Sequence, residues 1–187
     1  MRVFSLLIFV IILTGFSQNN TKKNYLTLNS SEFIVKGKTS IGKFDCKHES
    51  QAKDTLLLYK ENGFSKKIRV RKFSCGNFIL TGDFRKTLKH KEYPEVYFRL
   101  MDVQPNDEKF DKFTFDLYLK IAGKEKFLED LTLTQKNEEL HGEVQLKFSD
   151  FDLKPPRKLG GAITVEEDIK LVITLSIEDI ELWCEVC

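Results

Sequence analysis

Four cysteines are the side chains of this chain best suited to covalent chemistry: Cys46, Cys75, Cys184 and Cys187. In an oxidising compartment they would form disulfides, and four cysteines allow three pairings. Because the two clusters lie far apart in the sequence, we favour Cys46 with Cys75 and Cys184 with Cys187. The first bridge would close a loop of about 30 residues and stabilise the fold by ~3 kcal/mol. A redox or metal pair at Cys184 and Cys187 is disfavoured, because no strand-to-helix pattern surrounds them.

The histidines and carboxylates show no spacing typical of a catalytic or metal site. His48, His90 and His141 do not fall in HExxH or another metal-binding pattern. Asp102 and Asp116 could form an acid–base pair, but solvated strand faces explain them better. No Gly-x-Ser-x-Gly elbow, phosphate loop or dinucleotide fingerprint is present in the sequence. We therefore expect no catalytic residues, no metal and no cofactor, and predict that the protein is not an enzyme.

A basic segment between Lys66 and Lys91 is the clearest feature of the charge distribution. One hypothesis is a cationic rim that attracts an anionic headgroup, a phosphate or a lipid surface. The alternative, a solubilising face, is favoured because runs of charge are usually solvated. The residues assigned to this rim are Arg69, Arg71, Arg85, Lys86 and Lys89.

The composition predicts one globular domain with a large apolar interior. The chain has 187 residues, is 41% hydrophobic and contains 16 Phe. Its 30 basic and 28 acidic side chains leave a formal charge of +2. Nucleic-acid-binding proteins usually carry a strong basic excess, so we expect no nucleic-acid partner.

Residues 1–17 match the pattern of a signal peptide. Arg2 precedes an apolar run from Val3 to Leu13, and Gly15 and Ser17 supply small residues before a cleavage point. The run is short for a membrane span, so we predict export to the periplasm or medium and no membrane span after cleavage. An uncleaved anchor is the alternative. Residues 18–31 are expected to form a polar lead-in with little structure.

Apolar and polar residues alternate strictly in three segments, 113–121, 140–148 and 169–177. This period of two places one face of each strand in an apolar interior and is typical of antiparallel sheets. One helix is expected from about Asp83 to Lys91, where Phe84 and Leu88 are spaced i, i+4. Weaker strands are expected at 32–46 with a bend near 40–42, and at 54–60, 67–73, 95–102 and 127–135.

These elements predict an all-β fold, an eight-stranded antiparallel up-and-down β-barrel with one short helix. A sandwich is the alternative, but mostly short turns favour the barrel. The interior of an eight-stranded barrel is either filled by side chains or holds one small ligand. The predicted ligand-binding residues lie on the inward faces: Val96, Phe98, Leu100, Phe113, Phe115, Leu117, Leu119, Val144, Leu146, Phe148, Leu171 and Ile173. The same residues could instead pack a core without a ligand.

The stretch from Phe33 to Cys46 resembles the opening of the YceI-like family. The stretch from Asp83 to Phe98 is similar to the internal helix and following strand of that family, and Pro155–Gly161 with Val165–Leu175 is similar to its closing loop and last strand. The resemblance covers about residues 31–178. It implies an exported bacterial protein whose lipocalin-like barrel holds a polyisoprenoid or another long apolar chain, without shared catalytic residues. It also supports the Cys46–Cys75 pair, which a subset of the family has.

Two functional hypotheses follow for the barrel domain, residues 32–178, with the C-terminal tail at 179–187. The first is an exported, non-catalytic carrier whose apolar interior binds a long-chain isoprenoid or a similar amphiphilic lipid. The second is a structural or interaction module, whose packed barrel binds a protein partner through its outer face or tail.

Overall fold

The computed structural model describes residues 24–106 and 109–181. In this part of the chain, ten strands, one α-helix and three 3-10 helices follow one another. The strands are β1 (Tyr25–Thr39), β2 (Gly42–Ser50), β3 (Asp54–Leu57), β4 (Phe64–Arg69), β5 (Glu95–Pro105), β6 (Lys112–Ile121), β7 (Lys124–Lys136), β8 (Glu139–Lys147), β9 (Arg157–Lys158) and β10 (Ile163–Glu181). The helices are α1 (Phe78–Thr87), η1 (Val70–Lys72), η2 (Phe148–Phe151) and η3 (Leu159–Gly161).

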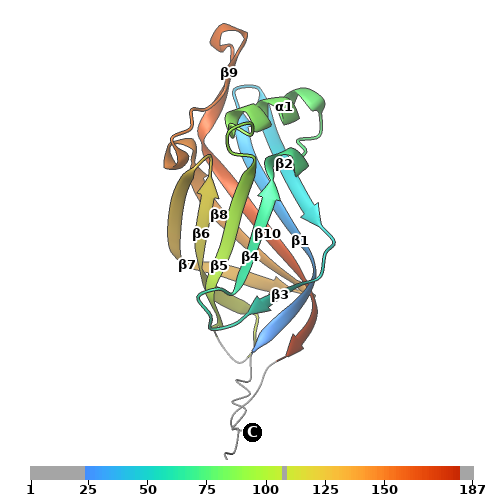
Figure 1. The fold of residues 1–187 in the computed structure, drawn as a ribbon. Coiled ribbons are helices and arrows are strands. Elements are labelled where there is room, and N and C mark those ends of the chain that lie inside the picture. Colours follow the sequence, from blue (N-terminus) through green and yellow to red (C-terminus); the bar gives the residue numbers. More distant parts are fainter. Residues whose placement is uncertain (1–23, 107–108, 182–187) are drawn as a thin grey trace, which may run out of the picture.

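The strands form one antiparallel sheet that curls around its long axis into an open barrel (Figure 1). Eight of them lie on a continuous path, in the order β2-β1-β10-β8-β7-β6-β5-β4. The two short strands lie off this path, with β3 paired to β1 and β9 paired to β10. The fold class predicted from alternation, an antiparallel barrel with eight main strands and a single α-helix, is confirmed.

The helix α1 lies across one end of the barrel, beside the β1–β2 turn and the β9 hairpin (Figure 1). We call this the helix end. The helix begins after Asn77, whose side-chain oxygen accepts a hydrogen bond from the backbone N–H of Leu80 at 2.9 Å. An Asn at this position satisfies one of the free N–H groups of the first turn. The helix therefore begins at Phe78, five residues before the predicted start at Asp83. It ends at Thr87, and not at the predicted end, Lys91.

Several predicted boundaries differ from those observed. Strand β1 begins at Tyr25, so residues 25–31 are not an unstructured lead-in. The short alternation from Tyr25 to Leu28 buries Leu26 and Leu28, although polar residues surround it in the sequence. Strand β4 ends at Arg69 and continues as η1, not as a strand to residue 73. Strand β10 extends to Glu181, past the predicted domain end at 178.

Other predictions lie outside the described residues. These are the signal peptide at 1–17 and the pair Cys184 and Cys187. Among the residues that are described, no helix has both the length and the apolarity needed to cross a membrane. Within the same part of the chain, no group of three or more potential metal ligands comes together.

The half of the barrel away from the helix is packed with side chains. Phe113 and Leu117 of β6 and Leu100 of β5 are fully buried there. Phe33 of β1 and Phe98 of β5 stack near the middle of the barrel, with ring centroids 4.6 Å apart. Close packing of this kind leaves no room for a ligand.

Candidate ligand-binding cavity

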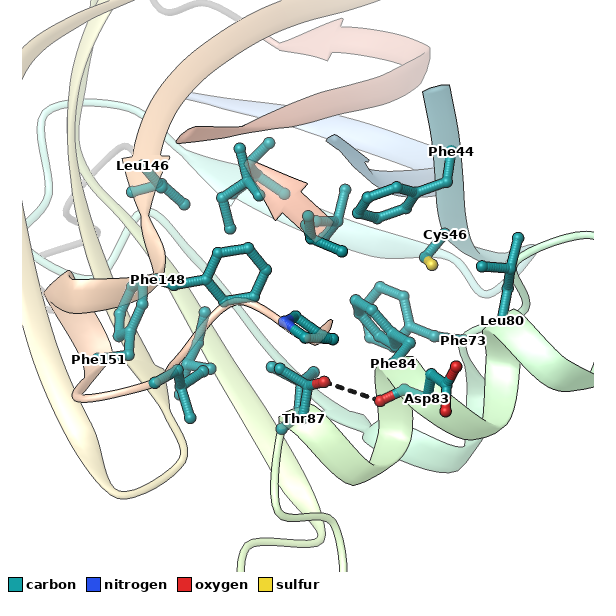
Figure 2. A pocket seen from close by; sticks show the side chains of 18 of the residues that line it. Phe44, Cys46, Phe73, Leu80, Asp83, Phe84, Thr87, Leu146, Phe148 and Phe151 are labelled. Atoms are coloured by element: carbon teal, nitrogen blue, oxygen red, sulfur yellow. Dashed lines mark hydrogen bonds between the residues drawn. The ribbon is translucent and has the colours of Figure 1, made fainter. Parts of the chain in front are cut away.

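An apolar cavity of about 120 Å³ lies at the helix end, between α1 and the inner face of the sheet. Its walls come from β1, β2, β5 and β10, and from the segment that follows β8 (Figure 2). The cavity is partly open to solvent. Six phenylalanines supply most of its aromatic surface: Phe44, Phe73, Phe84, Phe98, Phe148 and Phe151.

Several contacts fix α1 over the cavity. The Cys46–Cys75 disulfide joins β2 to the segment that leads into the helix. The Thr81 hydroxyl accepts a hydrogen bond from the N–H of Cys75 at 3.0 Å and donates one to the carbonyl of Asn77 at 2.7 Å. The ring of Phe84 lies 5.5 Å from that of Phe73. The helix is therefore a fixed wall of the cavity, and the predicted Cys46–Cys75 pair is confirmed.

Only four residues of the lining carry side chains with polar groups besides the disulfide: Thr39, Asp83, Thr87 and Lys158. All four are already engaged. Thr39 donates to the carbonyl of Gly42, and Thr87 donates to the carbonyl of Asp83 at 2.9 Å. The Lys158 Nζ lies 2.6 Å from Asp83 Oδ1 and links the β9 segment to α1. The arrangement suits the burial of an apolar group, and it holds no nucleophile paired with a base.

Five of the twelve predicted ligand-binding residues line this cavity: Val96, Phe98, Leu146, Phe148 and Leu171. The other seven are buried but lie outside its lining: Leu100, Phe113, Phe115, Leu117, Leu119, Val144 and Ile173. Alternation along a strand identifies every inward residue, whatever its height in the barrel. It does not distinguish the packed half from the hollow half.

Sequence reasoning missed most of the remaining lining residues because they lie outside the strictly alternating segments. Phe84 and Leu80 come from the helix, Phe73 from the end of η1, and Phe151 from η2. The position of the Phe44 ring depends on a glycine opposite it in the neighbouring strand β1. Phe44 is paired with Gly37, and a Cβ at Gly37 would clash with its ring.

The predicted cationic rim is only partly assembled. Arg69 and Arg71 are exposed, but Arg71 lies in η1 rather than on a strand. Arg85 donates through Nη2 to the carbonyls of Arg71 and Phe73, at 2.6 and 3.1 Å. Lys86 and Lys89 are exposed. None of the five lines the cavity, and the cation in its wall is Lys158, which the sequence analysis did not single out.

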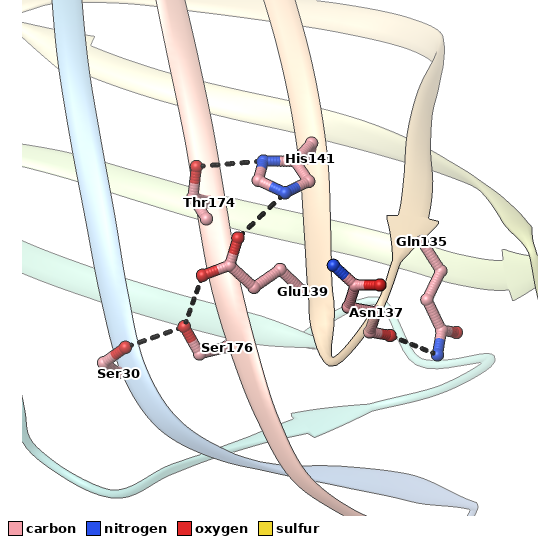
Figure 3. A network of polar contacts seen from close by, with 7 residues as sticks. All are labelled: Ser30, Gln135, Asn137, Glu139, His141, Thr174 and Ser176. Carbon is pink, nitrogen blue, oxygen red and sulfur yellow. Dashed lines mark hydrogen bonds and ion pairs between the residues drawn. The ribbon is translucent and has the colours of Figure 1, made fainter.

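A cluster of polar side chains lies on the outer face of the sheet, away from the cavity (Figure 3). His141 Nε2 is 3.0 Å from Glu139 Oε2, and His141 Nδ1 is 3.3 Å from the Thr174 hydroxyl. Glu139 Oε1 also accepts from Ser176, which in turn accepts from Ser30 at 2.9 Å. These contacts tie β8, β10 and β1 together. The residues do not line the cavity, so we assign the cluster a structural role.

No family model matches the chain, and no curated protein matches it. Several solved structures are similar to it, including the following three. The first is BcnA of Burkholderia cenocepacia, at 14% identity over 82% of this chain and 94% of that chain, with a TM-score of 0.47. The second is a polyisoprenoid binding domain from Saccharophagus degradans, implicated in plant cell wall breakdown, at 12% identity over 83% and 99%, with a TM-score of 0.48. The third is a YCEI protein of Campylobacter jejuni, at 15% identity over 98% and 92%, with a TM-score of 0.44.

The last two of these names fall in the family that the sequence stretches resemble. At such identities, and with TM-scores below 0.5, the similarities carry no argument about a ligand or an activity.

His48 of β2 should make stability depend on pH near the cavity wall. Its ring lies 5.7 Å from that of Phe73, and burial lowers its pKa from the usual value, with Lys66 and Lys72 adding to the effect. A backbone hydrogen bond at Lys72 acts in the opposite direction. Below a pH of about 6.5 the unfolded chain then binds the proton more readily than the folded chain does. The stabilisation is complete above that pH and is lost as the pH falls through the lowered pKa.

Urea unfolding of the wild type and of His48→Gln between pH 7.5 and 5.0 would measure this effect. We expect the free energy of unfolding of the wild type to fall on acidification, with a contribution from His48 of at most about 1.4 kcal/mol per pH unit. The variant should show a smaller slope. Carboxylates with lowered pKa values, such as Glu143 and Asp150, lose their contribution only at a lower pH. Equal slopes for both proteins above pH 5 would contradict the assignment.

Proposed function

We propose that this protein is an exported, non-catalytic binding protein that holds the apolar part of a long-chain isoprenoid or a similar amphiphilic lipid in the cavity beneath α1. The observation that carries the proposal is the lining, where the few polar groups are already hydrogen-bonded or ion-paired. A polar substrate would find almost no free partner there. An apolar chain would gain about 25 cal/mol for each Å² removed from water.

The size of the cavity limits how much of such a ligand can be enclosed. At about 120 Å³ it is smaller than the ~300–1,000 Å³ typical of pockets that enclose a whole small molecule. The packed half of the barrel, below Phe33 and Phe98, blocks further entry. We propose that one end of the chain is buried and that the rest leaves through the open side.

Native mass spectrometry of protein purified without removing lipids tests the proposal. A bound mass that matches a lipid and is lost on denaturation would support it. An empty protein in several preparations that also takes up no added farnesol, a C15 isoprenoid alcohol, would contradict it. That outcome would favour the second hypothesis, an interaction module with a packed interior.

Filling the cavity should weaken uptake without disturbing the sheet. Val165 of β10 lines the cavity, and Val172 of the same strand does not. In Val165→Trp, the indole would occupy the space of at least two ligand methylenes, at ~0.8 kcal/mol each. We therefore expect the affinity for farnesol to fall by at least about tenfold.

Titration of both variants with farnesol, followed by tryptophan fluorescence or calorimetry, would measure the difference. Val172→Trp is the matched control, because it places the same side chain on the same strand outside the cavity. It should bind farnesol as the wild type does. An equal affinity for Val165→Trp would rule out this cavity as the binding site.

A further inference from the structure

Exposed apolar side chains gather at the helix end of the barrel. The structure has six large hydrophobic residues that are strongly exposed, among those described. Four of them lie at this end: Phe78 (85% exposed), Leu159 (78%), Ile41 (73%) and Ile79 (61%). Of the other two, Tyr59 lies between β3 and β4 at the opposite end, and Phe127 lies in β7 near the β6–β7 turn. Exposed apolar residues grouped in this way mark a contact surface, whereas single ones need no explanation.

The four residues come from three segments that the fold holds together. Phe78 and Ile79 form the first turn of α1, Ile41 lies in the β1–β2 turn and Leu159 lies in the β9 hairpin (Figure 1). The backbone N–H of Ser40 donates to the carbonyl of Thr164 at 2.9 Å, which joins the turn to the strand after that hairpin. The Lys158–Asp83 ion pair joins the hairpin to α1.

Basic side chains surround these apolar residues. Segments 36–45, 69–95, 121–126 and 147–168, which build the helix end, contain 16 Lys or Arg against 10 Asp or Glu. Most of these cations, among them Lys38, Lys43, Lys86, Lys154 and Arg157, make no ion pair with the described part of the chain.

The opposite end has the reverse charge. Segments 51–62, 102–106, 109–112, 136–139 and 176–181 contain 5 Lys or Arg against 9 Asp or Glu. Although the net charge is only +2, the helix end is therefore positive and the opposite end is negative. A surface of negative potential would orient the protein with the helix end toward it.

We propose that the helix end docks on an anionic lipid bilayer. Phe78, Ile79, Ile41 and Leu159 enter the interface between headgroups and acyl chains, and the surrounding lysines and arginines contact the anionic headgroups. Apolar insertion combined with basic residues is the usual basis of peripheral membrane binding. The open cavity lies at the same end, between Leu80 and Asp83 on one side and Pro156 and Lys158 on the other. Docking would thus bring its mouth to the bilayer; this consequence rests on the proposed function, whereas docking itself does not.

Vesicle co-sedimentation tests the proposal. Vesicles of 30% phosphatidylglycerol in phosphatidylcholine should bind the protein at low salt, and pure phosphatidylcholine vesicles should bind it much less. Phe78→Ser/Ile79→Ser removes two inserting side chains that do not line the cavity. Its affinity for the anionic vesicles should fall by at least about tenfold. Tyr59→Ser is the matched control, since it removes an exposed aromatic residue from the opposite end of the barrel, and should bind as the wild type does.

A second pair of variants tests the charge. Lys43→Glu/Lys86→Glu reverses two cations at the helix end, and Lys60→Glu/Lys136→Glu makes the same change at the opposite end. The first pair should weaken vesicle binding by at least about tenfold and the second should not weaken it. All variants share residues 1–17, so any contribution of that segment is common to them.

The proposal is overturned by the absence of binding to anionic vesicles, by equal binding to neutral vesicles, or by equal losses in the test and control variants. A protein partner at the helix end would give the first of these results. Titration of the same variants with farnesol in the absence of vesicles separates the two proposals. Docking can fail while farnesol still binds, and farnesol binding can fail while docking persists.

Discussion

Replacement of Phe33 by alanine is expected to lower the free energy of unfolding by roughly 3–5 kcal/mol, the usual cost of removing a buried phenylalanine. Phe33 has no exposed surface, and it stacks on Phe98, which lines the cavity. The space left by the ring opens beside the cavity floor. We therefore expect Phe33→Ala to accept a longer apolar chain than the wild type, in spite of its lower stability.

Phe113→Ala is the matched control for this prediction. Phe113 is equally buried, but it packs against Phe110 outside the cavity lining. Its removal should cost a similar free energy of unfolding without changing the preferred length of the ligand. Urea unfolding gives the first quantity, and competition between dodecanol and hexadecanol for the protein gives the second. The same length preference in both variants would show that Phe33 does not form the floor.

Loss of the Cys46–Cys75 disulfide should have an effect of comparable size. The two residues are 29 apart in sequence, and a closed loop of that length contributes about 3–4 kcal/mol in the chain-entropy model. Because the bridge fixes the segment before α1, we also expect farnesol to bind more weakly once it is removed. Alanine is the suitable replacement at both positions, since both side chains are buried and a serine hydroxyl would need a partner.

Urea unfolding of the wild type and of Cys46→Ala/Cys75→Ala, each with and without dithiothreitol, would measure the contribution. The wild type should lose about the same free energy on reduction as it loses by substitution. The double variant should not respond to dithiothreitol. A remaining response would come from the pair Cys184 and Cys187, and a wild type indifferent to reduction would contradict the predicted stabilisation.

The charge pattern shows how much tertiary structure adds to a sequence observation. The basic segment from Lys66 to Lys91 is visible in the sequence, but it accounts for only part of the basic surface at the helix end. Lys43, Lys154 and Arg157 join it from distant segments. Conversely, Arg85 is half-buried and donates to two backbone carbonyls, so it is less available to a partner.

Local patterns in the sequence determined the antiparallel sheet, because alternation with a period of two reports directly which face of a strand is buried. They also determined that the interior is apolar. Separation in the sequence favoured two disulfides, of which Cys46–Cys75 lies within the described residues and is formed. The dry interior and the lack of a catalytic pattern follow from residue types, which need no coordinates.

Only the tertiary structure decided where the interior is hollow. Whether Leu117 and Leu146 fill space or border it depends on their height in the barrel, and that height is set by strand register and by how far the opposite wall lies. The cavity exists because α1 spans one end of the sheet, held by the disulfide and by the Lys158–Asp83 ion pair. These are contacts between distant segments. A periodic pattern within one strand carries no information about them.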